Sequence, residues 1–330
     1  MRQRISIGIV IALGLTVAGF ASHGGEAPRA QPLPEGEGIA AKHPGDQGIE
    51  QDPAVVFADG FEATDTGRLP DGYRKGGNTK WDNTWGGCLI MEQAENVHSG
   101  RKAVQMTIVR PGSGEAGGLS VEKHFEGGFD TLFLRYYAKF EKDTELYHGG
   151  AHNGAGIEAR APGVPQTCPG VRPDGTNKFG VLLDTWRPQP EIPSPGHLVT
   201  YVYHMDQGSR WGDQFFPSGI VIPPDRQLFG EQFVSRPDFI PERDRWYCYE
   251  LMVKANTPGE RDGRIAIWVD GKLVGDFPNL RFRTVASLKA DRIGLGMYTD
   301  NRRVRRDVTM WYDDVVAATS YIGPQTPAKQ

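Results

Sequence analysis

The segment Ile265–Val274 places the strongest local constraint on how this chain can fold. Ile265, Ile267 and Val269 occupy alternate positions and lead directly into the dipeptide Asp270-Gly271. Asp-Gly accepts the positive φ angles that a two-residue type I′ hairpin turn requires. The segment therefore predicts two antiparallel strands joined by a tight turn.

Similar runs of strand length recur along the chain between clusters of Gly, Pro, Asn and Asp. None of them sustains a long helical period, and helices do not alternate with strands. Together with 43 glycines, this pattern favours an all-β sandwich of two antiparallel sheets over a doubly wound fold. The other runs are Ala103–Val109, Thr131–Phe140, Lys178–Asp184, Leu198–His204, Tyr247–Val253, Arg292–Tyr298 and Val308–Ala317.

The first 52 residues are expected to lie outside this sandwich. Arg2 and Arg4 precede an apolar stretch, and Ala21 is a plausible cleavage site, so residues 1–21 are interpreted as a secretory signal peptide. A membrane anchor is the alternative, although the apolar run is short for a bilayer span. Residues 22–52 are rich in Gly, Pro, Glu and Ala and predict a disordered linker. We expect one domain over 53–324 and a tail over 325–330.

The overall charge and the cysteines exclude several classes of protein. A formal net charge of −4 argues against nucleic acid as a partner. Cys88, Cys168 and Cys248 are widely spaced and form no C-x-x-C pair, which argues against a metal-thiolate site. In an oxidising compartment two of them can form one disulfide, which leaves one free thiol. We expect a secreted, monomeric protein that is not held in a membrane.

Two stretches of the C-terminal half carry a family resemblance. Tyr201-Val202-Tyr203-His204 and the following Trp211-Gly212-Asp213 resemble a strand and loop of alginate and glucuronan lyases. The run from Trp246 through Asn256-Thr257-Pro258-Gly259 to Trp268-Val269-Asp270-Gly271 is similar to a second segment of the same families. The resemblance implies a concanavalin A-like β-jelly-roll and a polysaccharide lyase.

The chemistry implied by this resemblance is β-elimination on a uronate-containing, and hence acidic, polysaccharide. Such a reaction needs neutralisation of the uronate carboxylate, a base for the C5 proton and an acid for the leaving oxygen. Tyr201 and Tyr203 are two residues apart on one predicted strand, so their side chains share a face. Tyr203 is the first candidate for the base or the acid and Tyr201 for its partner. The alternative is that both rings pack as ordinary strand aromatics.

The chain departs from the family where the family carries a lysine and an arginine. The lysine loop corresponds to residues 148–154 here, with Ala151 at the position of the lysine, and the strand that would carry the arginine runs Phe179–Leu183. Histidine titrates near neutral pH, so His148 or His152 is a candidate base. Arg160 and Arg187 are candidates for pairing with a uronate carboxylate. A surface loop without a catalytic role is the alternative for the two histidines.

Further candidates for sugar binding come from a predicted strand and a predicted loop. Arg135, Tyr137 and Lys139 alternate onto one face of Thr131–Phe140, and a basic, aromatic face suits an acidic polymer. A solvated outer face is the alternative. Trp211 lies near loop signals, where an indole ring is free to stack on sugars.

A structural calcium ion is the one cofactor that the sequence suggests. Glu62, Asp313 and the segment around Ser99 and Lys102 resemble the calcium site of many jelly-roll carbohydrate modules. Glu62 and Asp313 are expected to supply carboxylates, and Ser99 and Lys102 backbone oxygens, which are hard ligands suited to Ca²⁺.

Two other functions are weighed beside the lyase. A non-catalytic carbohydrate-binding jelly roll is the first, because loss of the family lysine and arginine is what it predicts. A glycoside hydrolase is the second, but the paired carboxylates that hydrolysis requires are not evident on a predicted strand. The leading hypothesis is a secreted lyase acting on a uronate polysaccharide.

Overall fold

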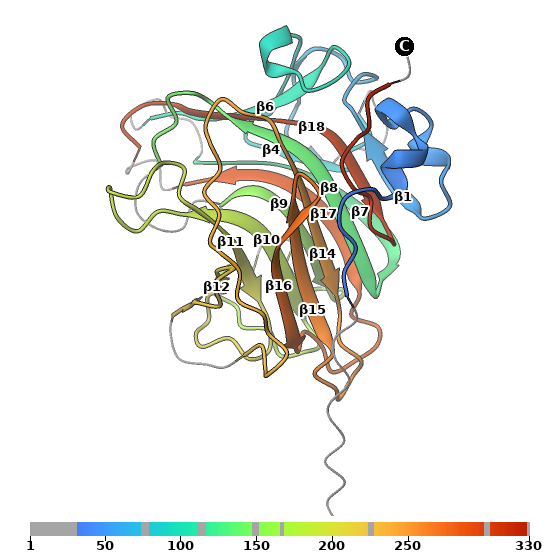
Figure 1. Cartoon of the computed structure of the whole chain (residues 1–330), viewed down its shortest axis with the longest axis vertical. Coiled ribbons are helices and arrows are strands. Elements are labelled where there is room, and N and C mark those ends of the chain that lie inside the picture. Colours follow the sequence, from blue (N-terminus) through green and yellow to red (C-terminus); the bar gives the residue numbers. More distant parts are fainter. Residues whose placement is uncertain are drawn as a thin grey trace, which may run out of the picture. The chain divides into compact units, whose positions relative to one another are not determined.

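The structure is a computed structural model of the chain, shown in Figure 1. It describes residues 32–73, 79–110, 117–146, 152–165, 168–223, 228–299 and 304–328. Within these ranges the secondary structure consists of β-strands and four short 3-10 helices. The expectation of an all-β fold is confirmed. The helices are η1 (Ile39–Lys42), η2 (Pro44–Asp46), η3 (Ile49–Gln51) and η4 (Ala94–Asn96).

The strands form two sheets, and their pairings in the described residues are antiparallel. Sheet A has the order β16-β15-β14-β8-β18-β6-β5-β2, with β1 also paired to β18. Its strands are β1 (Val55–Asp59), β2 (Gly67–Arg68), β5 (Leu89–Met91), β6 (Ala103–Ile108), β8 (Thr131–Phe140), β14 (Tyr247–Lys254), β15 (Gly263–Val269), β16 (Lys272–Leu280) and β18 (Val308–Ala318).

Sheet B carries the candidate functional residues and has the order β13-β12-β11-β10-β9-β17-β7-β4-β3. Consecutive strands pair from β9 to β13, whereas β17 returns from the C-terminal half to lie between β9 and β7. Its strands are β3 (Gly72–Tyr73), β4 (Asn83–Trp85), β7 (Gly118–Phe129), β9 (His152–Arg160), β10 (Lys178–Trp186), β11 (His197–Tyr203), β12 (Asp213–Phe215), β13 (Val221–Ile222) and β17 (Ala290–Tyr298).

The hairpin expected at Asp270-Gly271 joins β15 to β16. Val269 pairs with Lys272, and the two residues between them have φ angles of 49° and 75°. Two positive φ angles in succession are the mark of a type I′ turn. The local sequence signal is therefore confirmed in strand type, turn position and backbone conformation.

A single large hydrophobic core lies between the two sheets. Alternate residues of β8 in sheet A, including Leu132 and Leu134, pack in one cluster with Ile157 of β9 and Val202 of β11 in sheet B. Because side chains alternate across a strand, the residues between these core positions point to the outer faces. The candidate residues of β9, β10 and β11 are on the outer face of sheet B for this reason.

Residues 32–52 correct the expectation of an unfolded linker. Ile39, Ala40 and Ile49 are buried and join Trp268 in a second cluster on the outer face of sheet A. The indole N–H of Trp268 also donates to the Pro34 carbonyl at 2.7 Å. The segment contains few apolar residues on average. Those few are enough to fix it in place, because they pack on an apolar outer surface of sheet A.

The C-terminal strap, residues 321–326, crosses the same outer face. The carboxylate of Glu250 accepts backbone N–H bonds from Ile322 and Gly323 at 2.8 and 2.9 Å. The Thr326 carbonyl accepts the N–H of Gly45 at 2.8 Å, so ordered contacts continue past the expected domain end at 324. The C-terminal strap and the N-terminal segment therefore stabilise each other on this face of sheet A.

The thiols of Cys88, Cys168 and Cys248 are all free and buried. Among the described residues, no helix is both long and apolar enough to cross a membrane.

Candidate functional site

Four polar side chains from three adjacent strands gather on the outer face of sheet B. His152 begins β9, Asp184 lies near the end of β10, and Tyr201 and Tyr203 lie on β11. Their neighbours Leu183 and Val202 point into the core, so these four side chains point outward. The shared face expected for the two tyrosines is confirmed.

His152 and Asp184 form a hydrogen-bonded pair. The Nδ1 atom of His152 lies 2.6 Å from Oδ2 of Asp184. The His152 side chain is 30% exposed, whereas that of Asp184 is only 2% exposed. Burial by itself lowers the pKa of a histidine, but the charge and hydrogen bond of Asp184 outweigh it, so the pKa of His152 is raised. With Nδ1 held by Asp184, Nε2 is the ring nitrogen left for chemistry.

A second Asp–His pair on the neighbouring strands provides a contrast. His204 Nε2 lies 3.0 Å from Asp213 Oδ2, and both residues are buried. His204 thus points away from the two tyrosines and is a packed, hydrogen-bonded histidine. Of the two pairs, only His152–Asp184 presents an accessible imidazole.

The hydroxyl groups of Tyr201 and Tyr203 are linked to each other. Tyr201 donates its hydroxyl hydrogen to the oxygen of Tyr203 at 3.2 Å and accepts the backbone N–H of Gly212 at 3.0 Å. The Gly170 backbone also forms a hydrogen bond that lowers the pKa of Tyr203, as an N–H donor to the phenol oxygen does. The oxygen of Tyr203 thus accepts two bonds, which leaves its own hydrogen free to donate elsewhere.

Both tyrosines are protonated at neutral pH. Burial raises the pKa of Tyr201, and its hydrogen bond to Tyr203 raises it further. Burial also raises the pKa of Tyr203, partly offset by the bonds from Tyr201 and Gly170. A phenol with a raised pKa keeps its hydrogen at neutral pH and can act as a proton donor, so this face combines a proton donor with an imidazole. The rings of His152 and Tyr201 are 4.9 Å apart between centroids.

Lys178 and Asp184 were missed by sequence reasoning. The ammonium of Lys178 lies 3.8 Å from the ring centroid of Tyr203 and donates to the Cys168 carbonyl at 2.6 Å. Both residues belong to the run Lys178–Asp184, which was recognised only as a strand. Because Phe179, Val181 and Leu183 alternate into the core, the sequence could have placed Lys178 and Asp184 on the outer face. It could not have shown that they lie beside Tyr203 and His152.

The other candidate base and the two candidate arginines have different surroundings. His148 lies outside the described residues. Arg160 ends β9, and its guanidinium lies 2.7 Å from the Glu158 carboxylate on the same strand. Arg187 follows β10 and is bonded to the Glu145 carboxylate and to the carbonyls of Leu146, Pro190 and Ile192. Arg187 therefore stabilises the chain segment that follows β10. These contacts do not support its predicted role in substrate binding.

The basic and aromatic face of β8 is covered rather than open to a polymer. Arg135 is fully buried and forms an ion pair with Asp46 of η2. Tyr137 accepts the N–H of Gln325 at 2.8 Å, and Lys139 donates to the Glu95 carbonyl. These three residues are on sheet A and not with the tyrosines of sheet B, which corrects their assignment to substrate binding. The N-terminal segment, the strap and η4 take the place that a sugar was expected to fill.

Trp211 remains exposed beside the tyrosines. It is 46% exposed, and the next residue, Gly212, is the one that bonds to Tyr201. Its ring lies against Gly170, whose backbone contacts Tyr203. The exposed ring has a free face, and its stacking on a sugar stays a prediction.

The four candidate calcium residues come together around the loop 98–102. Glu62 accepts the N–H groups of Arg101 and Lys102, and Asp313 accepts those of His98 and Ser99. The oxygen atoms are of the kind that Ca²⁺ takes, and a carboxylate has lone pairs left after two such bonds. The described residues contain no group of three or more His, Cys, Asp or Glu side chains that could hold a metal ion. An ion here would thus depend on backbone carbonyls.

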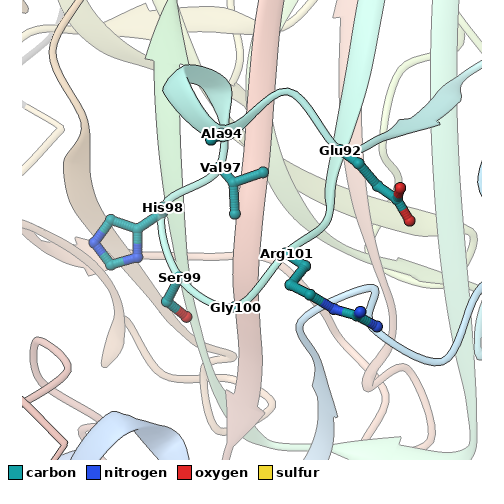
Figure 2. Close-up of a pocket in the computed structure, with 7 residues that line it drawn as sticks. All are labelled: Glu92, Ala94, Val97, His98, Ser99, Gly100 and Arg101. Atoms are coloured by element: carbon teal, nitrogen blue, oxygen red, sulfur yellow. The ribbon is translucent and has the colours of Figure 1, made fainter.

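The same loop lines a surface hollow, shown in Figure 2. Glu92 and Arg101 point to one side of the loop, and His98 and Ser99 to the other. None of the residues lining it belongs to the His152–Tyr203 face. The hollow is therefore separate from the candidate active site.

The fold is shared with polysaccharide lyases of known structure. A mutant of alginate lyase Aly36B in complex with alginate tetrasaccharide is 18% identical, covering 81% of this chain and 98% of that one with a TM-score of 0.53. The endo-β-1,4-glucuronan lyase of the fungus Trichoderma reesei is 17% identical, covering 81% and 96% with a TM-score of 0.50. The PL-14 alginate lyase of Aplysia kurodai is 14% identical, covering 72% and 89% with a TM-score of 0.51.

By sequence alone, no family model matches the chain. No curated protein matches it either. The fold thus defines its class as the jelly roll of alginate and glucuronan lyases. At these identities the likeness shows the fold, and the chemistry has to be argued from the residues on sheet B.

Proposed function

We propose that this protein is a secreted, monomeric polysaccharide lyase that cleaves a uronate-containing polysaccharide by β-elimination. The observation that carries the proposal is the meeting of an Asp-held imidazole, His152, with a pair of protonated phenols on one exposed face. These groups supply a base and an acid, which are two of the three requirements of the reaction.

His152 is the base in this proposal. Its Nε2 atom takes the C5 proton of the uronate, and Asp184 stabilises the imidazolium that forms. The electrons of the C5–H bond become the C4–C5 double bond, and the bond from C4 to the glycosidic oxygen breaks. Tyr203 is the acid, because its own hydroxyl hydrogen is free to pass to that leaving oxygen. Tyr201 holds the Tyr203 oxygen in place through their hydrogen bond.

The third requirement is a positive charge near the uronate carboxylate. Lys178 supports this role because its ammonium is beside the Tyr203 ring and the residue is only 5% exposed, so that its charge is poorly screened by water. Lys178 would act in place of the family lysine, whose position holds Ala151. The neighbouring Arg160 is balanced by Glu158 and is the weaker candidate.

The experiment that tests the function follows the ultraviolet absorbance of the unsaturated sugar. The mature protein is incubated with alginate, glucuronan, pectate and glycosaminoglycans, beside the His152→Ala variant. A rise in absorbance that the variant loses supports the lyase. Retention of the wild type on a polymer without any absorbance supports the alternative, a non-catalytic carbohydrate-binding protein.

Secretion and calcium are part of the same proposal. Cleavage after Ala21 would give a mature chain that begins at residue 22, which N-terminal sequencing of the exported protein tests. Calcium would tie Glu62 and Asp313 to the 98–102 loop and have no part in the chemistry.

A further inference from the structure

An exposed tryptophan lies on the same face as the candidate active site but several strands away. Trp85, at the end of β4, is 57% exposed and pairs with Ser120 of β7. The preceding Asn83 bonds to the outward-pointing Glu122, so Trp85 also points outward by alternation. An exposed indole ring combines a flat apolar face with a polar N–H edge, which suits stacking on a sugar ring.

Four glycines lie among the outward-pointing residues between Trp85 and the Tyr201–Tyr203 pair, beside Leu182 of β10 and Ser120 and Glu122 of β7. We call Gly156, Gly180, Gly294 and Gly296 the glycine lane; they lie on β9, β10 and β17. None of them has a positive φ, so the backbone does not require glycine there. An added Cβ at Gly294 or Gly296 would meet nothing closer than 3.3 Å. Packing therefore leaves room for a side chain at Gly296, where the nearest atom lies at 3.5 Å, whereas the contacts of 3.2 Å at Gly156 and 3.3 Å at Gly294 are tight.

Unpartnered polar atoms point to a ligand on this face. Asp184 and Gln214 are 2% and 4% exposed, yet Oδ1 of Asp184 and Oε1 of Gln214 have no hydrogen-bond partner among the described residues. Gln214 pairs with Tyr201, and one row of pairings runs from there through Leu182, Gly156, Gly294 and Glu122 to Asn83 of β4. Buried acceptors without partners are rare, and hydroxyl groups of a sugar are suitable donors.

We infer that Trp85 is a distal sugar-binding platform, and that a uronate polysaccharide lies across the strands over the glycine lane, from Trp85 to the Tyr201–Tyr203 pair. The ring of Tyr298, which is 49% exposed and stacked on His152 at 5.7 Å, lies at the active-site side of this path. The inference rests on the proposed function. It specifies the substrate as a long polysaccharide that is also bound at Trp85, at a distance from the glycosidic bond that is cleaved.

The span of the path sets the length of substrate required. From β4 to β11 the sheet order gives five strand spacings, or about 24 Å at roughly 4.8 Å each. A short oligosaccharide that fills the region around His152 and Tyr203 does not reach Trp85. Loss of the Trp85 ring should therefore weaken the binding of polymer and leave the handling of short chains unchanged.

Affinity electrophoresis in gels containing alginate or glucuronan tests this inference separately from catalysis. We expect Trp85→Ala to weaken the retardation seen for the wild type by about two- to tenfold in apparent Kd, the range of one aromatic contact. Val234→Ala, at a residue that is 62% exposed outside sheet B, is the matched control and should behave as the wild type. Equal retardation of Trp85→Ala and the wild type, or no retardation of the wild type by either polymer, overturns the inference.

The glycine lane is tested by Gly296→Val, which fills the space without touching Trp85. We expect an unchanged melting temperature and weakened retardation; retardation at the wild-type level contradicts the proposed path. A wild type that is retarded but gives no ultraviolet product refutes the lyase and leaves the platform standing. A wild type that cleaves polymer while Trp85→Ala keeps the same KM refutes the platform and leaves the lyase standing.

Discussion

The Nδ1 atom of His152 and the Oδ2 atom of Asp184 are 2.6 Å apart on the outer face of sheet B. Asp184 is buried and His152 is partly exposed, so the carboxylate fixes the ring and the ring meets solvent. This relationship gives His152 a defined tautomer, with Nε2 facing outward. It also distinguishes His152 from His204, whose partner Asp213 is buried with it.

Replacement of Asp184 by Asn is expected to change the pH profile as well as the rate. The charge of Asp184 raises the pKa of His152, and the base form exists only above that pKa, so activity should rise with pH through it. Asp184→Asn should move this acid limb to lower pH and reduce kcat. Asp213→Asn is the matched control, since it removes the carboxylate from the other histidine; it should affect the melting temperature and leave the acid limb in place. A shift of the acid limb of the pH–activity profile in both variants would contradict the role of Asp184.

The same pair should contribute to stability in a pH-dependent way. Because the folded protein holds His152 at a raised pKa, the pair stabilises fully below the ordinary histidine pKa of about 6.5. That contribution is lost as pH rises through the raised value. The melting temperature of the wild type should therefore fall relative to that of His152→Gln over this window, measured by scanning calorimetry. A constant difference between the two proteins would exclude the linkage.

The tyrosine pair should show unequal effects. Tyr203→Phe removes the proton donor and is expected to lower kcat by about 10²–10⁴-fold, the range of general acid catalysis. Tyr201→Phe removes a supporting bond and should cost less. Tyr137→Phe, on sheet A, is the control and should retain the wild-type rate. Initial rates of absorbance increase measure all three, and full activity of Tyr203→Phe would refute the assignment.

The N-terminal segment should be needed for stability. Asp46→Ala leaves Arg135 buried without its ionic partner, which is expected to cost about 3–5 kcal/mol of unfolding free energy. Arg245 and Asp270 form an exposed pair at 3.2 Å, with side chains 50% and 41% exposed. Arg245→Ala should therefore cost no more than about 1 kcal/mol. Urea unfolding measures the unfolding free energy of both variants. A small loss of unfolding free energy in Asp46→Ala, similar to that in Arg245→Ala, would contradict the importance of the buried pair.

Calcium should raise the melting temperature if it ties the 98–102 loop to the rest of the domain. At a free concentration about 100 times its Kd, an ion that binds only the folded state adds roughly 2.7 kcal/mol. Glu62→Gln should abolish this gain, whereas His43→Gln, a control in the N-terminal segment whose side chain is 19% exposed, should keep it. A melting temperature that is the same with calcium and with a chelator would remove calcium from the proposal.

Features that depend on neighbouring residues were predicted correctly from the sequence, and a feature that depends on a distant contact was not. Tyr201 and Tyr203 were placed on one face because alternation along a strand is a local property, and the Asp270-Gly271 turn followed from its own φ preferences. Arg135 was misplaced although it is on the same kind of strand, because its partner Asp46 is 89 residues away. An outer face can be solvated, bound to a ligand or covered by another segment, and alternation does not distinguish these cases.

The sequence by itself determined the class of fold, the hairpin at Asp270-Gly271 and the shared face of the two tyrosines, since each depends on residues close together along the chain. Only the tertiary structure decided that Asp184 holds His152, that Lys178 lies beside Tyr203, and that residues 32–52 cover sheet A. The physical reason is that these contacts depend on strand order and register. Sheet order puts Trp85 of β4 and Tyr201 of β11 on one surface, although more than a hundred residues separate them in the chain.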